Sequence, residues 1–187
     1  NILLKKAMQD VDNQHFIFIS NSCIPLKSFN YIYNSLNKNK SYFNKANSLY
    51  KMNKFKLYKA SQWCILNRTH SNVILNNIIM QNEIFSFLKN KGCPDEYVYL
   101  TILFNKNLQN DLVITSNKSA DAITFTGWPD MENYKIFEKT KLSKNQPNTY
   151  KHICLEELVY LINSNSLFGR KFEDNCSGLE NLINQII

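Results

Sequence analysis

Two carboxylates near the start of the chain have a spacing that binds metal ions in some proteins. Asp10-Val11-Asp12 matches the pattern D-x-D, in which paired carboxylates hold a divalent cation against a nucleotide. Such a pair has to follow a buried strand to face a ligand, whereas this one precedes the apolar run that begins at His15. The pattern therefore indicates an acidic helix end or turn rather than a metal site.

The five cysteines and three histidines are too scattered for a metal site. The cysteines are odd in number and form no C-x-x-C pair, whereas tetrahedral zinc needs clustered ligands. Cys23 lies in a predicted strand-end loop, but no His and Asp arrangement is visible that would activate its thiol. We interpret the cysteines as buried free thiols, with disulfides as the open alternative, and we predict no bound metal.

Apolar periodicity and turn residues predict helices alternating with short strands. The predicted helices are residues 2–12, 28–36, 71–89, 94–104, 155–163 and 177–187, and the predicted strands are residues 15–20, 63–66 and 122–126. Residues 37–58 and 129–149 are polar and rich in Lys, which favours loops. This order predicts an α/β fold in one domain covering residues 1–187, with ligands bound by loops that follow strands.

The charge of the chain does not indicate a nucleic-acid binder. The 187 residues include 22 Lys and Arg against 15 Asp and Glu, a net charge of +7, but the basic residues are scattered. No nucleic-acid motif accompanies them, so we predict no nucleic-acid partner. The densest basic group lies within residues 38–59, which we interpret as a solvated loop, with an anion-facing surface as the alternative.

Membrane and secretion signals are absent from the sequence. No run of about 18 apolar residues exists that would span a membrane. Lys5 and Lys6 lie where the apolar core of a signal peptide belongs. We therefore expect a cytoplasmic protein, with the lumen of the Golgi or endoplasmic reticulum as the alternative if an N-terminal anchor has been removed.

Four short motifs follow one another along most of the chain. They read F-I-S-N-S-C-I-P-L at residues 18–26, K-A-S-Q-W at 59–63, C-P-D-E-Y at 93–97 and L-F-G-R-K-F at 167–172. In this order they resemble the core-2/I-branching glycosyltransferase family, which includes branching β-1,6-N-acetylglucosaminyltransferases, peptide xylosyltransferases and plant and viral relatives. Ala60 stands where the family carries Gly.

The resemblance implies a fold and an activity. It implies a GT-A-like (Rossmann-like) sheet flanked by helices, a UDP-sugar donor and a glycan or glycoprotein acceptor. It also implies transfer with inversion and without a bound metal, N-acetylglucosamine being the favoured sugar. The family's first nucleotide-binding strand is expected upstream of residue 1, so we expect an N-terminally incomplete domain. The alternative is a truncated, inactive relative that serves as a carbohydrate-binding or assembly module.

The resemblance also implies roles for charged residues. Glu96 matches the general base of the family, although a carboxylate in a first helical turn can simply complement the helix dipole. Lys151 and Lys171 match the two cations that stabilise the leaving diphosphate, and Arg170 supports them. The first of these positions is Arg in the branching enzymes, and Lys lacks its bidentate geometry.

Further residues of the motifs and loops are candidates for contacts with substrate. Trp63 and Trp128 would stack on the apolar face of a sugar, with packing in the core as the alternative. The serines would supply polar contacts to donor or acceptor. The predicted substrate-binding residues are Ser20, Ser22, Ser61, Trp63, Asp95 and Trp128.

Overall fold

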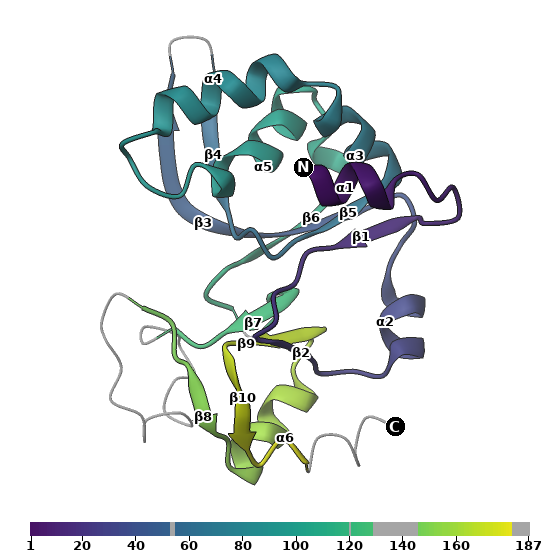
Figure 1. The fold of residues 1–187 in the computed structure, drawn as a ribbon, viewed down its shortest axis with the longest axis vertical. Coiled ribbons are helices and arrows are strands. Elements are labelled where there is room, and N and C mark those ends of the chain that lie inside the picture. Colours follow the sequence, from purple (N-terminus) through teal and green to yellow (C-terminus); the bar gives the residue numbers. More distant parts are fainter. Residues whose placement is uncertain (53–54, 120, 129–145, 181–187) are drawn as a thin grey trace. The chain divides into compact units, whose positions relative to one another are not determined.

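The computed structural model describes residues 1–52, 55–119, 121–128 and 146–180, and the chain divides into two compact units (Figure 1). Unit 1 consists of Asn1–Phe18 and Asn37–Ile114, and unit 2 of Ile19–Leu36 and Thr115–Ile187. Each unit has its own hydrophobic cluster. Helices and strands occur in both units, so the predicted α/β class is confirmed, whereas the single domain over residues 1–187 stays a prediction.

The sheet of unit 1 has the strand order β1-β5-β3-β4, and β6 pairs with β3 outside this series. The pairs β1–β5, β5–β3 and β3–β4 are antiparallel, with Phe16 opposite Leu66 and Tyr42 opposite Ile65. The strands are β1 (His15–Ile17), β3 (Ser41–Lys51), β4 (Lys56–Ala60), β5 (Ile65–Asn67) and β6 (Leu112–Ser116).

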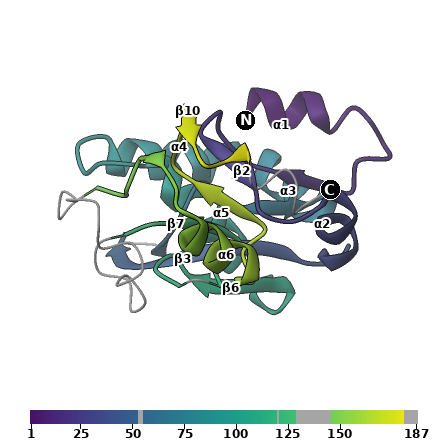
Figure 2. The same cartoon turned by 90° about the horizontal axis from the view of Figure 1, so that it is seen from below.

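Helices of unit 1 cover one face of this sheet (Figure 1). α5 packs against β4, α3 and α4, and its apolar residues, such as Leu100 and Ile102, are almost fully buried. A short α1 opens the chain and leads through a turn into β1 (Figure 2). The helices are α1 (Ile2–Ala7), α3 (Arg68–Leu75), α4 (Ile78–Leu88) and α5 (Asp95–Asn105), followed by the 3-10 turn η1 (Gln109–Asp111).

Three predictions for unit 1 are wrong. Residues 37–58, predicted as a loop, contain β3 and most of β4, because Phe43 and Leu57 enter the core while Lys and Asn occupy other positions. The single helix predicted over 71–89 is two helices, since α3 ends at the C-cap Asn76 and α4 begins at Ile78. The first helix ends at Ala7 rather than at residue 12.

Unit 2 contains two small sheets. In the first, β9 lies between β2 and β7, antiparallel to β2 and parallel to β7. In the second, β8 and β10 are parallel. The elements are β2 (Cys23–Pro25), α2 (Phe29–Ser35), β7 (Thr124–Thr126), β8 (Tyr150–His152), α6 (Leu155–Asn163), β9 (Phe168–Arg170) and β10 (Phe172–Ser177).

The predictions for unit 2 have mixed outcomes. The helices predicted over 28–36 and 155–163 are confirmed as α2 and α6. The helix predicted over 177–187 does not begin at Ser177, because this residue ends β10. Glu180 is helical, and residues 181–187 lie outside the described part of the chain. The loop predicted over 129–149 also lies mostly outside the described residues, which resume at residue 146. No helix among the described residues is long and apolar enough to cross a membrane.

A buried hydrogen-bond network connects β3, β5 and α3. The Ser41 hydroxyl accepts a hydrogen bond from the Asn67 backbone N–H at 2.9 Å and lies 2.7 Å from Nδ1 of His70. The hydroxyl has a second lone pair, so it either donates to Nδ1 or accepts from it, according to the tautomer of His70. Burial lowers the pKa of His70, because a charged ring would lose its hydration.

This histidine predicts a pH-dependent stability. The unfolded chain binds a proton at His70 more readily than the folded one, so the free energy of unfolding rises with pH up to the ordinary histidine pKa of about 6.5. Urea unfolding at pH 5 and pH 7.5 measures this rise. In His70→Asn the rise is smaller, and in the exposed control His152→Asn it is kept. An equal pH dependence in His70→Asn and the unchanged protein would contradict the prediction.

Candidate functional site

The carboxylate of Glu96 lies in the first turn of α5. Gly92 and Cys93 have positive φ angles of 79° and 43°, which reverse the chain between α4 and α5. Pro94 is the N-cap of α5, and Asp95 and Glu96 follow it as first-turn acids. The partial positive charge of a helix N-terminus favours carboxylates at these positions. The turn therefore presents Glu96 at the beginning of the helix, as the sequence predicts.

Glu96 forms an ion pair with Lys59 of β4. Lys59 Nζ lies 3.0 Å from Glu96 Oε2, and the two side chains are 30% and 25% exposed. Burial acts to lower the pKa of Lys59, but the hydrogen bond and the charge of Glu96 outweigh it, so this pKa lies above its ordinary value. Because water covers only part of the pair, its attraction is screened less than that of a fully exposed pair.

The packing of α5 on β4 holds the two partners in place. The Tyr58 backbone N–H donates to the Thr101 hydroxyl at 2.9 Å, and the rings of Tyr58 and Phe104 lie 4.2 Å apart. The ammonium of Lys59 also lies 6.0 Å from the centre of the Tyr97 ring. Tyr58, the residue before Lys59, therefore connects β4 to α5, the helix whose first turn carries Glu96.

The other predicted site residues of unit 1 lie near the end of β4 and the start of α5. Ser61 follows β4, its N–H donating to the carbonyl of Asn44 at 2.8 Å and its hydroxyl accepting from the N–H of Trp63 at 3.2 Å. Trp63 is half-buried, and Asp95 is exposed beside Glu96. The first motif residue of this region, Lys59, contacts the candidate base directly.

In unit 2 the structure brings the two serines of the first motif next to Arg170. The hydroxyls of Ser20 and Ser22 lie 2.9 Å apart, and the N–H of Ser20 donates to Cys23 Sγ at 3.4 Å. Antiparallel pairing places Cys23 opposite Arg170, and the carbonyl of Ser22 accepts from the N–H of Phe172 at 3.0 Å. This turn therefore lies beside the Arg170 end of strand β9.

The predicted cations Lys151 and Lys171 lie on adjacent segments of unit 2. Tyr150 is opposite Phe172 in the parallel pair β8–β10, and its N–H donates to the carbonyl of Lys171 at 2.7 Å. Lys171 is exposed, and Lys151 is 79% exposed with Glu173 at 3.6 Å. An ion pair this open contributes little, so the ammonium of Lys151 stays accessible to an anion.

Trp128 packs against the hydrophobic cluster of unit 2 and is only half-buried. Its packing agrees with the core alternative, while the exposed part keeps the ring available as a surface. Its predicted contact with a sugar stays a prediction.

The predicted site residues are thus divided between the two units. Glu96, Asp95, Ser61 and Trp63 belong to unit 1, and the remaining six belong to unit 2. The residue whose role the sequence did not indicate is Lys59, which was interpreted as part of a solvated basic loop. Its place at the head of the K-A-S-Q-W motif, ahead of an acid-rich helix start, is the only signal in the sequence that pointed to it.

The acidic pattern near the chain start forms a turn, as predicted. Asp10 Oδ1 accepts a hydrogen bond from the N–H of Asp12 at 3.0 Å, just after α1. Such Asx turns use the carboxylate to satisfy the backbone. In the part of the chain that the structure describes, no group of three or more His, Cys, Asp or Glu side chains is arranged to hold a metal ion.

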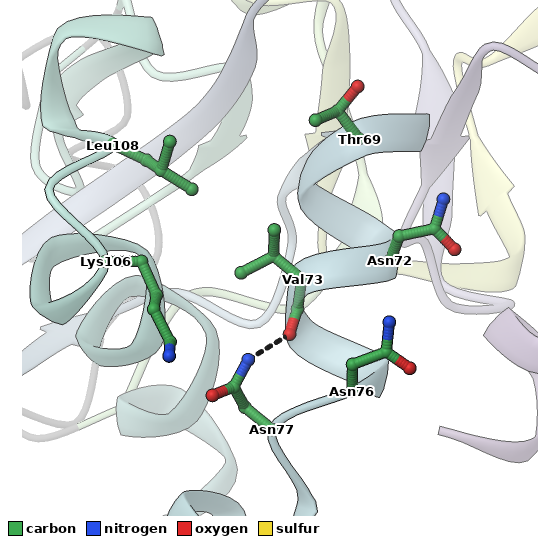
Figure 3. Close-up of a pocket in the computed structure, with 7 residues that line it drawn as sticks. All are labelled: Thr69, Asn72, Val73, Asn76, Asn77, Lys106 and Leu108. Carbon is green, nitrogen blue, oxygen red and sulfur yellow. Dashed lines mark hydrogen bonds between the residues drawn. The ribbon is translucent and has the colours of Figure 1, made fainter.

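A hollow of about 530 Å³ lies elsewhere in unit 1, outside the predicted site. Figure 3 shows Val73 of α3 on one side and Leu108 on the other, with the Asn77 amide donating to the Val73 carbonyl at 2.6 Å. The lining residues are Thr69, Asn72, Val73, Asn76, Asn77, Lys106 and Leu108. None of the predicted site residues lines this hollow.

Comparison with known proteins supports the resemblance found in the motifs. Residues 1–52 match the family described as Core-2/I-Branching enzyme. A segment of 105 residues is 27% identical to glycosyltransferase BC10 of rice, Oryza sativa subsp. japonica. The predicted resemblance to the core-2/I-branching family is confirmed, and the similarity to a glycosyltransferase agrees with the predicted class of protein.

These similarities cover only part of each protein. The match to the rice protein covers 50% of this chain and 26% of that protein's length. Of the predicted site residues, Ser20 and Ser22 lie within the family match, whereas Glu96 and the cations of unit 2 lie beyond it. The activity of the whole protein is accordingly a proposal for this chain.

Proposed function

Because the chain resembles the core-2/I-branching enzymes, we propose that it is part of an inverting glycosyltransferase that works without a bound metal. It moves a sugar, N-acetylglucosamine in this proposal, from a UDP-sugar to a hydroxyl of a glycan or glycoprotein. The family match over residues 1–52 supports glycosyl transfer. Within the structure, the proposal depends on one observation above all, the half-buried carboxylate of Glu96 held at the start of α5 by Lys59.

In this proposal Glu96 is the general base. The acceptor O–H bond breaks, its proton passes to Glu96, and the oxygen forms a bond to the anomeric carbon of the donor. The bond from that carbon to the diphosphate breaks on the opposite face, and its electron pair leaves with UDP. One displacement of this kind inverts the anomeric carbon and leaves Glu96 protonated until water removes the proton.

Basic side chains of unit 2 stabilise the leaving group in this proposal. The departing diphosphate gains negative charge, which fixed cations stabilise. Lys151 and Lys171 contribute exposed ammonium groups on adjacent segments, and Arg170 lies on β9 next to the paired serines. Ser20, Ser22, Ser61, Trp63, Asp95 and Trp128 then contact the donor or the acceptor.

The absence of a metal requirement is tested by chelation. We expect transfer of N-acetylglucosamine from the UDP-sugar to continue at an unchanged rate in millimolar EDTA, because Lys and Arg side chains replace the cation. The measurement is product formation by mass spectrometry, with UDP-glucose as a donor control. Activity that disappears in EDTA and returns with Mn²⁺ would contradict metal-independent transfer.

The alternative function, a carbohydrate-binding or assembly module without turnover, is separated by calorimetry. The proposed enzyme binds UDP through the cations of unit 2, so titration with UDP gives a saturable heat that weakens with added salt. A chain that binds a glycan but shows no heat with millimolar UDP would favour the module.

A further inference from the structure

We propose that Lys59 is a positioning residue for the reaction, one that fixes the orientation of the Glu96 carboxylate. This inference rests on the function proposed above, in which Glu96 takes the proton of the acceptor. It assigns a role to a side chain that comes from a different element, β4, and that does not itself take part in proton transfer.

The geometry assigns different tasks to the two carboxylate oxygens. Lys59 Nζ lies 3.0 Å from Oε2 of Glu96, whereas Oε1 has no hydrogen-bond partner among the described residues. A carboxylate held at one oxygen has a defined plane, so the second oxygen has a defined direction. Oε1 is therefore the atom that receives the proton of the acceptor hydroxyl.

The surroundings of Lys59 keep the ammonium at this place. The Tyr97 ring lies 6.0 Å from Nζ, and the strand that carries Lys59 is joined to α5 through the Tyr58–Thr101 hydrogen bond. Both partners of the ion pair are therefore attached to the same strand–helix contact. A long, flexible side chain loses less freedom on pairing when its neighbours already restrict it.

Kinetics of three variants test the inference. In Lys59→Met we expect kcat to fall about 100-fold, the loss that a misplacement of about 1 Å produces. The KM values for donor and acceptor stay nearly unchanged, because the ion pair orients the base and does not itself bind substrate. Lys59→Arg recovers most of kcat. The control Lys56→Met, which changes an exposed lysine on the same strand, leaves kcat and KM unchanged.

A change in Lys59→Met that raises KM as much as it lowers kcat would overturn the inference, because a general structural defect has that effect. A loss of kcat that Lys59→Arg does not restore would overturn it as well.

Titration of the amine tests the pair independently of turnover. Removal of the charge in Glu96→Gln leaves burial as the main influence, so the pKa of Lys59 falls. Reductive dimethylation with ¹³C-formaldehyde and NMR titration measure this change, and Lys59→Arg identifies the signal. If the pKa of Lys59 is the same in Glu96→Gln as in the unchanged chain, the role of Lys59 alone is overturned. If the pKa of Lys59 falls as expected in Glu96→Gln but the unchanged chain transfers no sugar, the proposed function is overturned, and the positioning role with it.

Discussion

Replacement of Glu96 by Gln is expected to reduce transfer by at least about 100-fold, the range by which general bases accelerate proton transfer. The amide has nearly the shape of the carboxylate, but it does not accept a proton at neutral pH. Binding of UDP is expected to stay unchanged, because the proposed cations for the diphosphate belong to unit 2. Initial rates at saturating donor and acceptor, together with UDP calorimetry, measure the two effects separately.

The folded state should tolerate this change. The Lys59–Glu96 pair is partly exposed, and such pairs contribute about 0–1 kcal/mol to stability, so the melting temperature changes little. Asp12→Asn provides a control, since it removes an exposed carboxylate from the turn after α1. Full transfer by Glu96→Gln would refute its role as the base.

The largest expected effect on stability comes from Gly178→Ala. Gly178 has a φ of +93°, and a Cβ atom added there lies 2.1 Å from the carbonyl oxygen of Ile153. Backbone atoms cannot rotate away as a side chain does, so the end of β10 has to move away from β8. We expect a loss of about 3 kcal/mol or more in the free energy of unfolding, measured by urea unfolding.

Gly92→Ala separates the two causes of this loss. Gly92 also has a positive φ, +79°, but a Cβ atom there meets nothing within 4 Å. Its expected cost is that of the left-handed conformation alone, about 1–2 kcal/mol. Equal losses in the two variants would show that contact with Ile153 contributes nothing.

The sequence predicted the elements whose signals are local. α6 agrees with its prediction in both bounds, because its apolar period is regular and acids occupy its first turn. α5 begins where Pro94 and two acids indicate a helix start. Strands β3 and β4 were missed because each places only some residues in the core. In β4, Leu57 and Ala60 are buried, whereas Lys56 and Lys59 are not. The buried positions are therefore not every second residue, and the alternation typical of a half-buried strand is missing.

The same limit applies to the candidate site. The four short motifs sufficed to select Glu96, Ser20 and Arg170 as candidates, since each motif is local. They did not reveal that Lys59 pairs with Glu96, because this contact depends on how α5 packs against β4. The break between α3 and α4 was also missed, because the apolar period continues past Asn76.

The strand pairing of unit 2 has a consequence for synthesis of the chain. β2 pairs with β9, and the backbone N–H of Leu26 donates a hydrogen bond to the carbonyl of Leu167, far along the sequence. At about 5–20 residues per second, β2 waits on the order of 10 s for its partner to leave the ribosome. All of unit 1 is made before that moment. Unit 2 is therefore the later part to fold, and the part that interrupted synthesis would leave incomplete.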